Sequence, residues 1–183
     1  MNLSNKASID TSAHRNKILR KLHNPLTVAG MLVSHIKYTT DNATKLYGEG
    51  YYTSDEGHGG GVYFTNPHKT VTLHYTIGVD YMIEEVELTF GLDLPEDLNV
   101  TKQLPKKIFS NKVSDTLSID GIITLGCDSL FLKSVLGKPT TVEKTEDSII
   151  YKYQDSDSEY GFYEGTYYFH NNKLIKFRIY CGC

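Results

Sequence analysis

Three tyrosine-containing, strand-forming runs follow one another near the C-terminus, at residues 148–154, 160–170 and 174–180. Residues 155–158 (Asp-Ser-Asp-Ser) separate the first two runs, and an Asn-Asn pair at 171–172 separates the last two. Both separators are rich in residues that favour turns. Because short turns join neighbouring antiparallel strands, the pattern predicts a C-terminal meander of three strands.

The middle of the chain carries further strand signals. At 82–90, Val86 and Leu88 alternate with Glu85 and Glu87, which is typical of a strand with one buried face. Residues 62–65 predict a short strand, and 70–76 fits either a strand or a helix that begins after Asn66-Pro67.

Two helices are expected near the N-terminus, one within residues 12–22 and one over 26–34, after Asn24-Pro25. A strand at 36–40 and a polar loop as far as Gly61 should follow. A third helix is predicted to begin at Asp128 or Ser129 and to end at Gly137.

These elements predict an α+β fold with a mainly antiparallel sheet, N-terminal helices and the C-terminal meander. The chain is expected to form a single domain over 1–183, with a possible subdivision into 12–110 and 119–180. At 183 residues, 39% of them hydrophobic and 22% charged, it is long enough to bury one core. No internal repeat is visible in the sequence.

Composition also bears on location. No apolar stretch approaches the roughly 20 residues of a membrane span, and no signal peptide is recognisable. Three cysteines, an odd and sparse set, favour a reducing compartment. We therefore expect a cytoplasmic protein with no membrane contact. With a pI near 6.1, nucleic-acid binding is not expected.

Tyrosines and acids are concentrated at the C-terminal end of the chain. Residues 151–180 hold seven of the fourteen tyrosines, and residues 141–170 carry seven acids against two lysines. Tyrosine is enriched at protein interfaces, and an acidic field attracts basic partners. The pattern predicts a partner-binding surface made of Tyr153, Asp155, Asp157, Glu159, Tyr160, Tyr163 and Glu164.

One motif spans the second half of the chain. It consists of the run Gly121 to Gly126, the predicted helix after it, Gly137 to Pro139, and Tyr167-Tyr168-Phe169 followed by Asn171-Asn172. This motif resembles the helix-plus-meander module of the BamE/SmpA family over residues 119–180. The resemblance implies a compact α+β module of a kind that serves as a protein-binding platform.

A second motif is the run of three glycines at 59–61 with Val62-Tyr63-Phe64-Thr65. It resembles a segment of the ADP-ribosyltransferases in which the tyrosine stacks on nicotinamide. The resemblance implies a site for NAD with His35 upstream, Tyr63, and Glu85 or Glu87 as the acid. The alternative interpretation is that the glycines permit a tight strand entry and the aromatic rings pack.

No other constellation predicts catalysis or a metal site. His58, His68 and His74 match no zinc spacing, and no nucleophilic triad can be assembled around Cys127. In size and composition the chain resembles immunity proteins of bacterial contact-dependent growth inhibition systems. That resemblance implies a non-enzymatic inhibitor without a cofactor, which binds a cognate basic toxin of the nuclease type one to one. An NAD-dependent transferase is the alternative.

Overall fold

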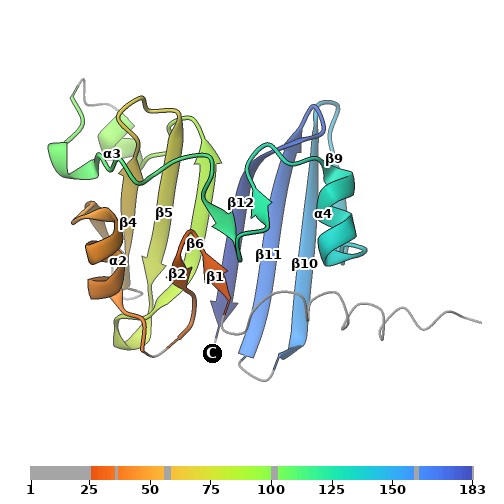
Figure 1. Ribbon diagram of the computed structural model, residues 1–183, viewed down its shortest axis with the longest axis horizontal. Helices are drawn as coiled ribbons and strands as arrows, with labels where there is room; N and C mark the ends of the chain where they lie inside the picture. Colours follow the sequence, from red (N-terminus) through yellow and green to blue (C-terminus); the bar gives the residue numbers. More distant parts are fainter. Residues whose placement is uncertain (1–25, 36, 56–58, 100–102, 159–160, 183) are drawn as a thin grey trace, which may run out of the picture.

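The fold is α+β with mainly antiparallel sheets, as predicted. The computed structural model describes residues 26–35, 37–55, 59–99, 103–158 and 161–182 (Figure 1). The helix predicted within 12–22 lies outside the described residues. The large sheet has eight strands, in the spatial order β3 (Tyr51–Asp55), β4 (Gly59–Thr65), β5 (Val71–Ile77), β6 (Ile83–Phe90), β12 (Lys173–Gly182), β11 (Gly161–His170), β10 (Ser148–Ser158) and β9 (Thr141–Lys144).

A smaller sheet of two hairpins lies against the middle of the large sheet (Figure 1). Its order is β2 (Met31–Leu32), β1 (Thr27–Val28), β7 (Ser118–Ile119) and β8 (Ile123–Thr124). The helices are α2 (Thr40–Tyr47), α3 (Glu96–Asn99) and α4 (Ser129–Leu136), with 3-10 turns η1 (Val79–Tyr81) and η2 (Lys106–Ile108). Within the part of the chain that the structure describes, none of these helices is long and apolar enough to cross a membrane.

The order of the elements repeats once along the chain. Each half consists of a hairpin, an eight-residue helix and four strands that pair in sequence order: β1–β2, α2 and β3–β6, then β7–β8, α4 and β9–β12. In the large sheet the order β3-β4-β5-β6 meets β12-β11-β10-β9, so β6 and β12 are neighbours at the centre. In the small sheet β1 and β7 meet in the same way. The two halves are therefore related by an approximate two-fold arrangement, which the sequence did not reveal.

The prediction of a helix over 26–34 is wrong, because these residues form the β1–β2 hairpin. Ala29 and Gly30, at the turn, have φ values of 50° and 75°. Positive φ at both central positions is the signature of a type I′ turn, whose twist suits a two-residue hairpin. The strand predicted at 36–40 and the polar loop predicted as far as Gly61 are also wrong, because a helix begins at Thr40 and residues 51–55 form β3. Residues 40–47 form α2 because Thr39 and Asn42 make a capping box, with Thr39 N donating to Asn42 Oδ1 at 3.1 Å.

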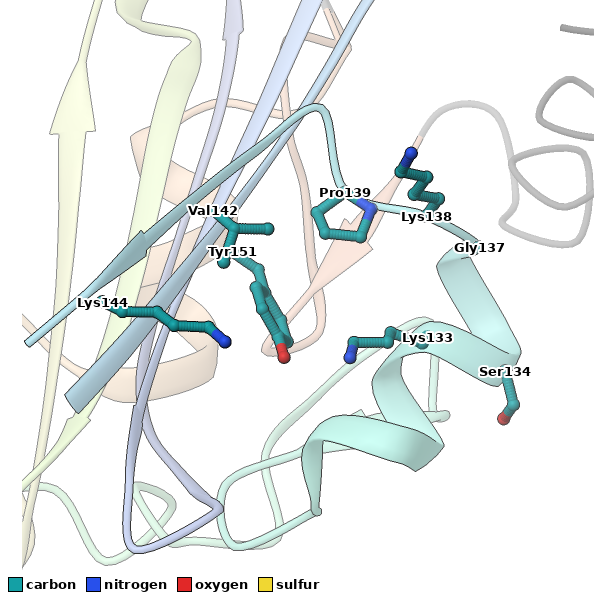
Figure 2. A pocket seen from close by; sticks show the side chains of 8 residues that line it. All are labelled: Lys133, Ser134, Gly137, Lys138, Pro139, Val142, Lys144 and Tyr151. Atoms are coloured by element: carbon teal, nitrogen blue, oxygen red, sulfur yellow. The ribbon is translucent and has the colours of Figure 1, made fainter. Parts of the chain in front are cut away.

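Helix α4 begins and ends where the sequence predicted. The Asp128 side chain accepts a hydrogen bond from Phe131 N at 2.7 Å, and Gly137 ends the helix with φ 79°. Figure 2 shows α4 lying beside the strand that carries Tyr151, with Lys133 facing the tyrosine ring.

We expect Asp128→Ala to lower the free energy of unfolding by about 1 kcal/mol, because the first turn of α4 loses its cap. Urea denaturation followed by circular dichroism measures this difference. Asp115→Ala removes an exposed acid from a loop and serves as the control, with an expected change below about 0.5 kcal/mol. Equal effects of the two substitutions would show that the cap contributes nothing.

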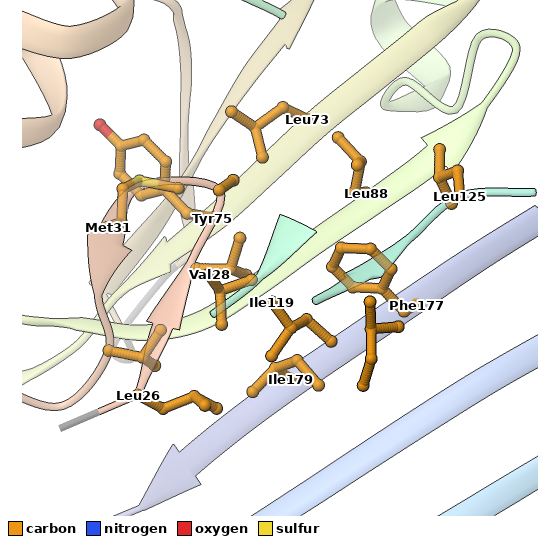
Figure 3. Packing of buried hydrophobic residues seen from close by; sticks show 14 of the residues in the cluster. Leu26, Val28, Met31, Leu73, Tyr75, Leu88, Ile119, Leu125, Phe177 and Ile179 are labelled. Carbon is orange, nitrogen blue, oxygen red and sulfur yellow. The ribbon is translucent and has the colours of Figure 1, made fainter. Parts of the chain in front are cut away.

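One hydrophobic core runs through both halves. At the seam between them, Val86 pairs with Ile179 and Leu88 pairs with Phe177, and all four side chains are fully buried. Figure 3 shows side chains of the two hairpins, among them Val28 and Ile119, lying over the seam at Leu88, Phe177 and Ile179. The hairpins thus cover the centre of the large sheet, while α2 and α4 contribute buried residues to the same core on either side.

Candidate functional site

The two faces of the large sheet differ in chemistry. One face packs on the hairpins, α2 and α4, and supplies the apolar core. We call the opposite side the open face. Residues that pair directly across antiparallel strands share a face. The register therefore defines the open face by a row from β4 to β10, consisting of Tyr63, His74, Glu87, Arg178, Thr166 and Lys152.

Ion pairs join the two halves across the seam on the open face. Lys176 Nζ of β12 lies 2.9 Å from Glu87 Oε1 of β6 and 2.8 Å from Asp93 Oδ2. Arg178 Nε of the same strand lies 3.5 Å from Glu85 Oε2. The seam is thus closed by charge pairs on one side and by packed apolar side chains on the other.

The second half carries the more accessible part of this surface. Lys152 Nζ lies 2.7 Å from Glu143 Oε1, and the two side chains are 35% and 49% exposed. Gln154 Nε2 donates to Glu164 Oε2 at 3.2 Å. The ring of Tyr168, which is half-buried, lies 5.7 Å from Lys176 Nζ. Aromatic and charged groups thus alternate over β10, β11 and β12.

Burial changes the acid–base properties of this face. Desolvation raises the pKa of Glu85 and of Glu87, although the neighbouring Arg178 and Lys176 act in the opposite direction. Burial, and secondarily the positive charge of Lys176, lowers the pKa of His74 to about 4. His74 is therefore neutral at physiological pH.

The first half of the open face is partly closed. The rings of Tyr63 and His74 stack with centroids 4.1 Å apart. Leu94, Leu98 and Ile108, from the segment that joins the two repeats, form a small second core against Tyr51 and Tyr63. The accessible portion therefore extends from the seam toward β10.

The residues predicted to bind a partner are divided between the two faces. Tyr153 is only 3% exposed, and its hydroxyl donates to the Gly137 carbonyl oxygen at 3.0 Å. This burial corrects its prediction as an anchor, because a partner cannot reach the ring. Tyr163 is half-buried beside the core, with its hydroxyl 3.0 Å from that of Tyr167. Glu164 does lie on the open face.

The remaining members of that predicted set lie in or near the β10–β11 hairpin. Asp155 and Asp157 belong to strand β10, and Asp155 pairs with Tyr163. Glu159 and Tyr160 lie outside the described residues. The open-face residues that sequence reasoning missed are Tyr168, Lys176 and Arg178. Their positions follow from strand parity, since Tyr168 has the same parity in β11 as Glu164.

The residues of the transferase motif are only partly brought together. Tyr63 and Glu87 lie in one row with His74 between them, and Glu85 lies on the same face. His35 follows the first hairpin, where Ser34 N donates to the Ile83 carbonyl oxygen at 2.7 Å, at the start of β6. The ring that Tyr63 would offer to nicotinamide is already stacked on His74. The structure therefore places Tyr63, Glu85 and Glu87 on one face, with the Tyr63 ring stacked on His74.

Other candidate chemistry finds little support in the described part of the chain. No three His, Cys, Asp or Glu side chains there lie close enough together to hold a metal ion. Burial raises the pKa of the Cys127 thiol to about 11, so this cysteine is protonated at neutral pH and is a poor nucleophile.

Comparisons with known proteins show a structural likeness and no match in sequence. No family model matches the sequence, and no curated protein matches it. This chain is similar to the crystal structure of a DUF4309 family protein, YjgB from Bacillus subtilis, with a TM-score of 0.44 and 13% sequence identity. The similar region covers 84% of this chain and 83% of YjgB.

Proposed function

We propose that this chain is a protein-binding inhibitor, an immunity protein that neutralises a basic bacterial toxin by one-to-one binding on the open face. The observation that carries the proposal is the accessible half of that face, where Tyr168 lies 5.7 Å from Lys176 and shares the face with Lys152 and Glu164 on three neighbouring strands. A rigid sheet holds such side chains in fixed positions, which lowers the entropic cost of binding. The resemblance of residues 119–180 to BamE/SmpA modules also supports a binding platform.

The charges of this face favour a basic partner. Among the charged residues that make ion pairs or side-chain hydrogen bonds on this face, acids outnumber bases, with Glu85, Glu87, Asp93, Glu143 and Glu164 against Lys152, Lys176 and Arg178. A nuclease toxin is basic because it binds phosphate backbones. Within this proposal the chain acts in the cytoplasm, where such a toxin attacks its substrate, and it needs no cofactor.

We expect Tyr168→Ala to weaken binding of the basic toxin about thirtyfold, because a central aromatic anchor typically contributes about 2 kcal/mol. The partner for the measurement is the basic polypeptide that co-purifies one to one with the tagged chain from cells expressing its neighbouring genes, titrated by calorimetry. Tyr52→Ala is the matched control. Tyr52 is 50% exposed on β3, and its pairing with Val62 places it off the open face. Its substitution should change the affinity less than twofold.

The same titration decides between the two functional classes. An inhibitor binds the basic polypeptide, suppresses its toxicity and leaves NAD unbound. Saturable NAD binding that Glu87→Gln abolishes, with no effect of Tyr168→Ala on any protein partner, would overturn the proposal in favour of the transferase.

A further inference from the structure

A cleft of about 630 Å³ lies between α4 and the edge of the large sheet, away from the open face. Figure 2 shows the residues that line it: Lys133, Ser134, Gly137, Lys138, Pro139, Val142, Lys144 and Tyr151. Val142 pairs with Tyr151 across β9 and β10, so both belong to the core side of the sheet. The volume is within the range of sites that bind small molecules.

A buried tyrosine presents its hydroxyl to this cleft. The side chain of Tyr151 is only 4% exposed, and its ring packs on Phe169 with centroids 5.3 Å apart. In Figure 2 its hydroxyl points toward the space between Lys133 and Lys144. Within the described residues this hydroxyl has no hydrogen-bond partner. The hydroxyl is not one of the fully buried polar atoms without a partner, so it faces the open space of the cleft and can donate a hydrogen bond to a ligand there.

The charge of the cleft has one sign. Three lysines line it and no carboxylate does. Lys133 Nζ lies 4.9 Å from the centre of the Tyr151 ring, and Lys144 forms no ion pair with any described residue. The nearby acid Glu143 pairs with Lys152 on the opposite face. Two ammonium groups and one phenol therefore converge without an anion between them.

The helix of the first repeat has the same construction but carries no lysine at the position equivalent to Lys133. Gly48 N donates to the Thr44 carbonyl oxygen, and Gly137 N donates to the Lys133 carbonyl oxygen, both at 2.8 Å. The uncharged Thr44 thus occupies in α2 the position that Lys133 occupies in α4. A lysine in the last turn of a helix is favoured by the helix dipole. That effect accounts for Lys133 but not for Lys144, which lies on the strand.

We infer that this cleft binds the phosphate group of a small organic phosphate. Lys133, Lys144 and the Tyr151 hydroxyl are its donors, and Val142 and Pro139 contact the organic part. Ammonium and hydroxyl donors are the usual partners of phosphate oxygens, and such charge-assisted hydrogen bonds are strong. The room beside the donors exceeds what a bare phosphate ion needs, which favours an organic phosphate. This site does not depend on the open face or on its partner.

Phenyl phosphate, inorganic phosphate and phenol are the probes for this site. Each is titrated into the full chain at low ionic strength while backbone amide NMR shifts are followed. We expect saturable shifts at residues 133–144 and 151 with phenyl phosphate, about tenfold weaker binding of inorganic phosphate, and no saturation with phenol. Tyr151→Phe removes only the hydroxyl, and Lys144→Ser removes an exposed charge. Each should weaken phenyl phosphate binding about tenfold.

Tyr52→Phe and Lys112→Ser, which alter an exposed tyrosine and an exposed lysine elsewhere, are the matched controls and should leave binding unchanged. Thermal unfolding checks that each variant is folded. If Tyr151→Phe does not fold, Lys144→Ser still tests the site. Inorganic phosphate binding as tightly as phenyl phosphate would overturn the organic part of the inference. Shifts that do not saturate, or that weaken equally in Lys112→Ser, would overturn the site itself.

Discussion

Replacing Phe177 with alanine is expected to lower the free energy of unfolding by about 3 to 5 kcal/mol. The Phe177 ring is fully buried on the central strand β12, where it pairs with Leu88 of the first repeat and Tyr167 of its own. Removing it opens a cavity between the two halves. The midpoint of thermal unfolding should fall by roughly 6 to 20 °C. Urea denaturation and differential scanning calorimetry measure the two quantities.

Ile175→Ala is the control for this prediction. Ile175 lies on the same strand but is 36% exposed, so its truncation should lower the free energy of unfolding by less than about 1 kcal/mol. Because the core is continuous through both repeats, both variants should unfold in one transition. Two transitions, only one of them shifted by Phe177→Ala, would show that the repeats unfold independently.

The seam explains why two similar halves form one unit. A four-stranded sheet alone ends in an open edge, which readily pairs with another strand. Here the edges of β6 and β12 pair with each other, and those of β1 and β7 do the same in the small sheet. Each half thus protects the edge of the other. The short, fully exposed strand β9 is left at one end of the large sheet, where the cleft is found.

Local patterns predicted β6, the three long C-terminal strands and α4, but they missed β3 and β9 and placed a strand at 36–40, where the described residues lead into α2. The three C-terminal runs correspond to β10, β11 and β12, and the run at 82–90 corresponds to β6. Turn chemistry supports them, since Asn171 and Asn172 both have positive φ in the β11–β12 turn. The region 70–76, which fitted either element, is strand β5 because its neighbours on both sides complete the sheet.

Features that depend on tertiary pairing were not predictable. Residues 26–34 are apolar at a spacing that fits a helix, and only the turn at Ala29-Gly30 and the pairing of Val28 with Ile119 make them a hairpin. The candidate surface was misassigned for a related reason. Adjacent tyrosines such as Tyr167 and Tyr168 lie on opposite faces, and composition alone does not tell which face is buried.

His74 should make the stability of the fold depend on acidity between pH 7 and pH 4. Its pKa is lowered to about 4 in the folded chain, mainly by burial, against an ordinary value of 6.5. Between these two values the unfolded chain binds a proton that the folded chain does not. Stability therefore falls as the pH falls through this window. The histidine alone should cost about 3 kcal/mol by pH 4.

The surroundings of His74 support this sign. Its Nε2 has no hydrogen-bond partner among the described residues, and the imidazole stacks on Tyr63 instead. A Cβ atom at Gly61 would lie 2.6 Å from Nε2, so the absent glycine side chain makes room for the ring. Of the nearby charges, Lys176 opposes protonation and Asp93 favours it. A proton on this ring is thus added without compensation by a direct partner.

His74→Phe keeps the stacked ring and removes the nitrogen. At pH 7 the variant should be more stable by about 1 kcal/mol, because an unpaired buried polar atom is gone. At pH 4 its advantage over the natural chain should grow by a further 3 kcal/mol or so.

Glu85 and Glu87, whose pKa values burial raises, contribute stability that is lost as the pH rises, so they oppose the histidine in both proteins. The difference between the two urea-denaturation curves at each pH therefore isolates His74. His68→Phe, at an exposed turn, is the control, and its stability should differ from that of the natural chain by the same amount at pH 7 and at pH 4. If the stability of His74→Phe depends on pH as steeply as that of the natural chain, burial of His74 does not oppose its protonation.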